Sequence, residues 1–118
     1  MTFEEGIEFT QQLFEEHPDV DGIFAITDLV AVGALAYCNE QKINVPKEVK
    51  VIGFSNWFMS QVITPKLSTV EQPSREMGIA AFNLLLEEMV ARKEEIEFTP
   101  KTIELDTEII ERESSAKH

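Results

Sequence analysis

Side chains suited to holding a small polar ligand follow two short apolar runs of the sequence. The four candidates for ligand contact are Thr27, Ser55, Asn56 and Trp57. Hydroxyl and amide groups exchange hydrogen bonds with polyols, and an indole ring can stack on the apolar face of a sugar. We therefore predict ligand binding by these residues, with helix capping at Thr27 and a plain polar turn at 55–56 as the alternatives.

Residues that could carry catalysis or hold a metal are sparse. His17 precedes a proline and His118 is the last residue, and neither has a partner at a metal-site or triad spacing. Cys38 lies in an apolar pattern that predicts a buried, inert thiol. The sequence has no phosphate-binding glycine motif and no nucleophile elbow. We expect no enzymatic activity, no cofactor and no metal.

Composition narrows the class of protein further. The 118 residues suit one domain, and an apolar content of 43% argues against disorder. The formal net charge is −12, whereas DNA binding relies on clustered Lys and Arg, so this chain alone is not expected to bind DNA. One cysteine fits a reducing, cytoplasmic compartment, and no apolar run reaches membrane-spanning length.

The two apolar runs are predicted to be buried strands of one parallel sheet. Runs 22–26 and 50–54 are rich in β-branched and aromatic residues. A helix is predicted over 29–40, capped by Thr27 or Asp28, and capping is the preferred role for Asp28. A strand, helix and strand at this spacing imply parallel pairing. Because ligands bind beyond the carboxyl ends of parallel strands, the candidates would meet at one edge.

Other elements are predicted on both sides of this unit. Thr2 and Glu5 form a capping-box pattern before an amphipathic helix that ends at His17. A long helix from Pro73 carries apolar residues on two faces, so it must be covered on more than one side. Two short strands are predicted over 101–105 and 108–111, and the polar tail after Arg112 is expected to be frayed.

Four segments, in order along the chain, carry a family resemblance. They are Phe24-Ala-Ile-Thr-Asp28, Val51-Ile-Gly-Phe-Ser-Asn56, Ile63-Thr-Pro-Lys-Leu-Ser-Thr-Val-Glu-Gln-Pro73 and Ile110-Glu-Arg-Glu-Ser114. Together they resemble the C-terminal part of LacI-family transcriptional regulators over nearly the whole chain. The resemblance implies an α/β fold, a partial type I periplasmic-binding-protein-like lobe with a parallel sheet flanked by helices. Family members sense a small molecule, usually a sugar, and bind DNA through an N-terminal helix-turn-helix, which this sequence lacks.

The resemblance also implies how the chain is divided. Residues 1–71 and 106–118 would belong to the C-terminal lobe of the sensor, and the helix–strand excursion 72–105 to the N-terminal lobe. The implied lobe crossings are at Glu71, Gln72 and Asp106. Without its host lobe, the helix from Pro73 is predicted to fold back on the chain's own sheet or to pack against a second copy.

Two positions depart from the family pattern. Where the family usually has Asp, this chain has Ser55, and loss of the carboxylate makes an anionic sugar more plausible as effector because it removes repulsion. Lys42 stands where the family usually has Gly, so a left-handed residue there costs roughly 1 kcal/mol.

The resemblance further implies a homodimer. The implied interface residues are Val32, Leu35, Phe58 and Met59. For Trp57, both the ligand cleft and the dimer interface stay open. The predicted function is effector sensing and dimerisation in a LacI-like regulator that contacts DNA only through a missing segment. The alternatives are a periplasmic sugar-binding protein of a transporter and a ligand-free α/β oligomerisation module. The identity of the effector stays open.

Overall fold

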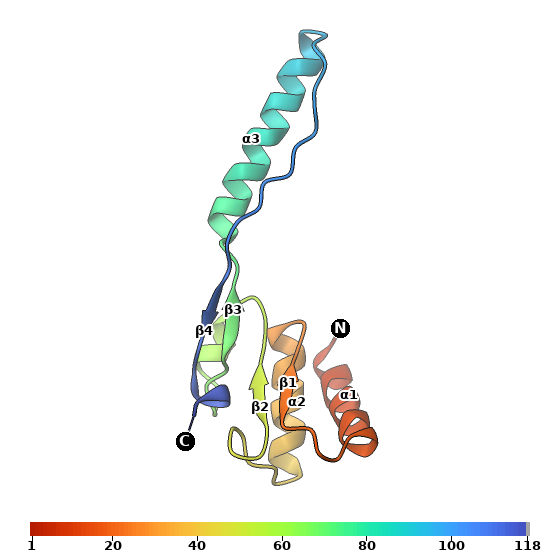
Figure 1. The fold of residues 1–118 in the computed structure, drawn as a ribbon, viewed down its shortest axis with the longest axis vertical. Helices are drawn as coiled ribbons and strands as arrows, with labels where there is room; N and C mark the ends of the chain where they lie inside the picture. Colours follow the sequence, from red (N-terminus) through yellow and green to blue (C-terminus); the bar gives the residue numbers. More distant parts are fainter. Residues whose placement is uncertain (118) are drawn as a thin grey trace. The chain divides into compact units, whose positions relative to one another are not determined.

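The computed structural model describes residues 1–117, which form two compact units (Figure 1). Unit 1 consists of residues 1–71 together with the chain from 108 onward, and unit 2 consists of residues 72–107. His118, one of the two histidines considered above, lies outside the described residues.

The predicted strand–helix–strand arrangement is confirmed in unit 1. Strand β1 (Gly22–Phe24) pairs in parallel with β2 (Lys50–Ile52), and helix α2 (Asp28–Glu40) connects them. Each strand ends two residues before its apolar run does. The carboxyl ends of both strands therefore lie at the same edge of the sheet, as parallel pairing requires.

A second pair of strands extends unit 1. Strand β3 (Thr69–Glu71) pairs with β4 (Glu108–Ile110) in antiparallel orientation. The N–H of Gly53 donates to the carbonyl of Ser68 at 2.8 Å, so the chain leaving β2 runs alongside the start of β3 (Figure 1). Because β3 precedes unit 2 in the sequence and β4 follows it, these two strands are the connections between the units.

Helix α1 (Phe3–Glu16) packs directly on α2 through a pair of glycines. A Cβ atom on Gly6 would lie 2.5 Å from the carbonyl oxygen of Val30, and one on Gly33 would lie 2.4 Å from that of Phe3. The backbones of the two helices therefore touch, which only glycine allows. Thr2 caps α1 as predicted, and its side chain accepts the N–H of Glu5 at 3.1 Å.

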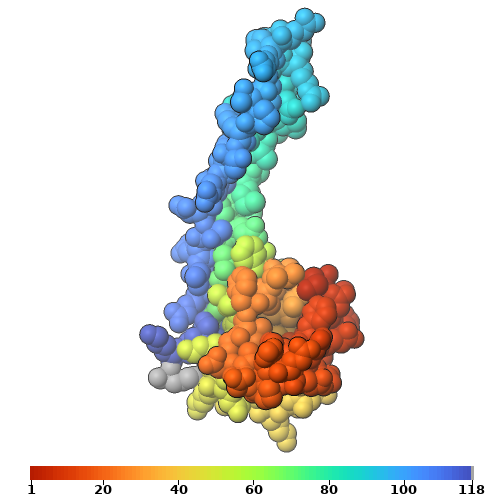
Figure 2. Space-filling view, turned by 45° about the vertical axis from the view of Figure 1, so that its right-hand side comes forward, coloured from red at the N-terminus to blue at the C-terminus, as the bar shows by residue number. Residues whose placement is uncertain are grey.

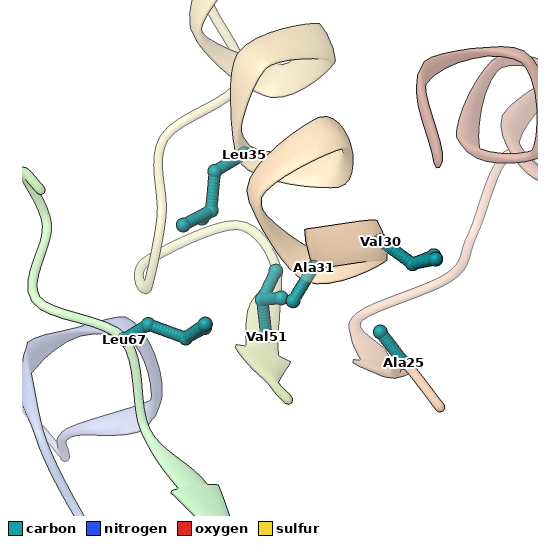
Figure 3. Close-up of a cluster of buried hydrophobic side chains, with 6 residues drawn as sticks. All are labelled: Ala25, Val30, Ala31, Leu35, Val51 and Leu67. Carbon is teal, nitrogen blue, oxygen red and sulfur yellow. The ribbon is translucent and has the colours of Figure 1, made fainter. Parts of the chain in front are cut away.

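The core of unit 1 lies between α2 and the sheet (Figure 3). Its buried members are Ala25, Val30, Ala31, Leu35, Val51 and Leu67. Leu35 points into this core and is 7% exposed, so its observed role is packing within unit 1, and its contact in a dimer stays a prediction. Helix α2 contacts both the sheet and α1, and a helix buried on two sides has no single apolar stripe.

The prediction of a buried thiol is confirmed, and it has a measurable consequence. Cys38 has no exposed surface, and burial raises the pKa of its thiol to about 11, with the Glu48 carboxylate acting in the same direction. The neutral thiol is therefore favoured in the folded chain. Its contribution to stability is complete below the ordinary thiol pKa of about 8.5 and is lost as the pH rises through 11.

We expect Cys38 to react with Ellman's reagent at pH 8 far more slowly than free glutathione does, because the thiolate is both scarce and shielded. Full reactivity should return in urea at the concentration that unfolds unit 1. A reaction in buffer as fast as that of glutathione would contradict the buried position.

Unit 2 is a helix with an irregular chain returning along it. Helix α3 (Ser74–Lys93) is followed by a turn at Glu95, which has a φ of 54°. The returning chain runs beside the helix (Figure 2), and Lys101 Nζ lies 3.1 Å from Glu87 Oε2. The strand predicted over 101–105 is not formed. A strand needs a neighbour with which to exchange backbone hydrogen bonds, and the return segment within this unit lies against a helix.

The apolar residues of α3 that sequence patterning marked as needing cover are not buried, since no residue of this helix is. Exposed examples are Phe82 at 60% and Met89 at 57%. Such a surface is unusual for an isolated soluble unit. No helix among the described residues has the length and apolar character needed to cross a membrane.

Candidate functional site

The predicted ligand residues lie at the edge of unit 1 formed by the carboxyl ends of β1 and β2. Thr27 is the N-cap of α2, and its Oγ1 accepts the N–H of Val30 at 3.2 Å. Thr27 therefore caps the helix, as the alternative to ligand binding predicted. Thr27 is partly exposed, and a hydroxyl oxygen that accepts one hydrogen bond has a second lone pair.

Asp28 is not the cap that it was predicted to be. It is the first residue of α2 and is 2% exposed. Its Oδ2 accepts the N–H of Trp57 at 2.7 Å, and its Oδ1 accepts the hydroxyl of Thr69 at 2.7 Å. The carboxylate thus ties the start of α2 to the chain after β2 and to β3, and the helix N-terminus favours its negative charge.

Residues 55–57, called the 55–57 loop below, have an unusual backbone. Ser55 has a φ of 101° and Asn56 a φ of 51°, although neither is glycine. The loop is held from several sides, because the N–H of Ser55 donates to Val70 O at 2.8 Å and the N–H of Asn56 to Thr69 Oγ1 at 3.1 Å. Backbone strain of this kind persists only where the surroundings impose it, and it occurs often at binding sites.

The side chain of Asn56 is engaged within the chain. Its Oδ1 accepts from Arg112 Nη2 at 2.9 Å and from Ser60 Oγ at 3.3 Å, and its Nδ2 donates to Glu71 Oε1 at 3.4 Å. An amide with these partners has little capacity left for a ligand. The ligand contact of Asn56 stays a prediction, and its structural role is the observed one.

Two exposed aromatic side chains continue the same edge. Trp57 is 41% exposed and Phe58 63% exposed, and their rings meet edge to face with centroids 5.5 Å apart. Phe58 begins the short 3₁₀ helix η1 (Phe58–Gln61), in which Met59 is partly buried. The exposed faces of both rings are available for a ligand or for another protein surface.

Sequence patterning missed the role of the C-terminal segment. The tail after Arg112 was expected to be frayed, but its residues Glu113 and Ser114 are bound into unit 1, and Ser114 has no exposed surface. The hydroxyl of Ser114 donates to Val51 O at 2.6 Å and accepts the N–H of Ser68 at 2.8 Å. The polar composition was misleading because these side chains satisfy buried backbone groups instead of meeting water.

The side chain of Arg112, just before this tail, also binds several parts of unit 1. Besides Asn56, it donates to Ser60 Oγ at 2.7 Å and to Leu67 O at 2.8 Å. The signal that could have indicated its role was the motif Ile110-Glu-Arg-Glu-Ser114, which the family resemblance singled out without assigning a contact. Over residues 1–117, no group of His, Cys, Asp or Glu side chains could hold a metal ion.

Comparisons of the sequence with known proteins find a family model and curated relatives that match nearly the whole chain. The family model of the periplasmic binding protein-like domain matches residues 2–115. The HTH-type transcriptional repressor PurR of Escherichia coli O1:K1 is 35% identical over 113 residues, which cover 96% of this chain and 32% of the repressor. This chain thus spans about a third of the length of the curated relatives that it matches.

The structure is also similar to solved structures of transcriptional regulators. The complex of the transcriptional regulator CelR with cellobiose is similar with a TM-score of 0.88 and 28% identity, over 98% of this chain and 34% of that one. A LacI family transcriptional regulator from Arthrobacter sp. FB24 in complex with lactose is similar with a TM-score of 0.80 and 31% identity, over 98% and 42%.

Proposed function

The chain belongs to the periplasmic-binding-protein-like domain family in the form found in LacI-family transcriptional regulators, and from this membership we propose that it forms part of an effector sensor. Its place would be the C-terminal lobe of the sensor, with unit 2 serving the N-terminal lobe. The effector would be a sugar or sugar derivative, and DNA would be contacted through a helix-turn-helix outside this segment. A cytoplasmic homodimer is part of the proposal.

The strained 55–57 loop is the observation that carries this proposal. It stands at the carboxyl end of β2, beside the N-cap Thr27 at the end of β1, where open parallel sheets bind ligands. The buried Asp28 carboxylate holds the loop amide of Trp57 in place. Such a pre-organised polar edge with an exposed indole suits a polyol, which needs hydrogen bonds on its rim and an apolar face for stacking.

Trp57 and Phe58 allow ligand contact and dimer contact to be separated. In the full-length protein, we expect Trp57→Ala to weaken sugar binding by about threefold to tenfold through loss of stacking, and to leave the dimer intact. Phe58→Ala should show the reverse, with more monomer in analytical ultracentrifugation and unchanged affinity. The probes for titration calorimetry are cellobiose, lactose and glucose 6-phosphate, the last because Ser55 replaces an acidic residue.

The proposed assignment would be contradicted if Trp57→Ala weakened the dimer and Phe58→Ala weakened sugar binding. That result would place Trp57 at the interface and Phe58 in the cleft. If none of the three probes binds and the dimer persists, a ligand-free oligomerisation module becomes the better interpretation.

The transporter alternative has its own test. The gene sequence upstream of the codon for Met1 should encode a basic helix-turn-helix and the rest of the N-terminal lobe. A secretory signal peptide there would instead make the protein an exported sugar-binding protein.

A further inference from the structure

The amide of Asn56 contacts residues from both segments that connect the units. Its Nδ2 donates to Glu71, the last residue of β3 before the chain enters unit 2. Its Oδ1 accepts from Arg112, which lies two residues beyond the end of β4, after the chain has returned. One side chain of the 55–57 loop is thus bound to the outgoing and to the incoming connection.

Arg112 is itself rigidly placed. Its backbone N–H donates to Ser68 Oγ at 2.7 Å, and the same hydroxyl donates to its carbonyl oxygen at 3.2 Å. The guanidinium is a planar fork of donors, so fixing the backbone also restricts where its donors point. They reach one acceptor in each of three places: the 55–57 loop, η1 and the chain just before β3.

The backbone of the loop needs this support. Asn56 is left-handed and follows Ser55, whose φ is also positive, and neither residue is glycine. A conformation of this kind relaxes unless neighbouring groups impose it. The charge-assisted bond from Arg112 to Asn56 Oδ1 comes from outside the loop and from a distant part of the sequence.

We propose that Arg112 is a positioning residue for the 55–57 loop, acting through Asn56. It does not touch the ligand; it fixes the geometry in which Ser55 and Trp57 are presented, and it joins that geometry to both connecting strands. The inference rests on the proposed function in one respect only, that the loop faces the effector.

Amide hydrogen exchange followed by NMR tests this without any ligand. The reporters are the amides of Trp57 and Asn56, which donate to Asp28 and Thr69, and the amide of Ala25, which donates to Ile52 O within the sheet. In Arg112→Gln, we expect the loop amides to exchange about tenfold faster, the factor that corresponds to losing one charge-assisted hydrogen bond. Ala25 should change much less.

Two further variants complete the design. Arg112→Lys keeps the charge but loses the fork, so the loop amides should exchange at an intermediate rate. Arg92→Gln is the matched control, because Arg92 is an exposed arginine of α3 that binds Glu88 at 2.8 Å, and it should leave all three reporters unchanged.

Equal acceleration of Ala25 and Trp57 would make Arg112 a general stabiliser and overturn the proposal, as would unchanged loop amides. If Arg112→Gln does not fold, the same exchange measurement is made on Asn56→Gly. This substitution removes the oxygen that accepts from Arg112, and glycine tolerates the left-handed backbone. Retained protection of Trp57 in that variant would also overturn the proposal. A failure of sugars to bind the full-length protein would count against the proposed function and leave the exchange result standing.

Discussion

Replacement of Asp28 by alanine is expected to lower the free energy of unfolding of unit 1 by about 2–6 kcal/mol, since two donors lose their acceptor and each unsatisfied buried group costs about 1–3 kcal/mol. The donors are the N–H of Trp57 and the hydroxyl of Thr69, both within 2.7 Å of the carboxylate. A domain of this size has only about 5–15 kcal/mol of stability, so the variant would be partly unfolded at moderate temperature. Urea denaturation followed by circular dichroism measures the change.

The chain offers a matched control for this experiment. Asp19 is an exposed aspartate in the turn before β1, and Asp19→Ala should change the free energy of unfolding by less than about 0.5 kcal/mol. The loss of stability in Asp28→Asn should lie between those of the two alanine variants. The amide keeps one acceptor oxygen, but its NH₂ group would face one of the two donors, Trp57 N–H or Thr69 O–H. An Asp28→Ala variant as stable as Asp19→Ala would show that Trp57 and Thr69 find other partners.

Gly33→Ala is expected to destabilise unit 1 by about 1–3 kcal/mol, the usual cost of forcing an extra carbon into a closed contact. The added Cβ would lie 2.4 Å from Phe3 O and 2.9 Å from the Cα of Gly6. Both are backbone atoms, so relief requires α1 to move away from α2. The same urea titration measures the effect, which should appear together with increased exposure of the α1–α2 contact to proteolysis.

Gly78 supplies the control, since it lies inside α3 and a Cβ there would meet nothing within 4 Å. Replacing an exposed helical glycine by alanine normally favours the helix by about 0.5–1 kcal/mol. Gly78→Ala should therefore raise helicity while Gly33→Ala lowers stability. If both substitutions stabilise, the two helices of unit 1 are not in backbone contact.

Local patterns predicted the local structure well. The two apolar runs became β1 and β2, and Thr2 caps α1. Lys42, which stands where the family pattern usually has Gly, is left-handed with a φ of 59°. Each of these outcomes depends on residues that are close together in the sequence. Capping, strand formation and left-handed turns are decided by side chains within a few positions of one another.

The long-range features of the site could not be predicted in this way. The bond between Asp28 and Trp57 spans 29 positions, and that between Asn56 and Arg112 spans 56. No spacing rule covers such separations, so Asp28 was interpreted as a cap and the tail as frayed. The strand over 101–105 failed for a related reason, because its formation depends on a partner strand and not on its own composition.

The buried hydroxyl of Ser114 has a consequence for how the protein is made. It satisfies the carbonyl of Val51, which lies 63 positions earlier in the chain. A ribosome adding about 5–20 residues per second needs roughly 3 to 13 s to cover that interval. Throughout that time β2 has left the site of synthesis without the residues that complete its surroundings. Unit 1 therefore cannot complete its hydrogen bonding until Ser114 has been synthesised, and the carbonyl of Val51 lacks this partner for the whole interval.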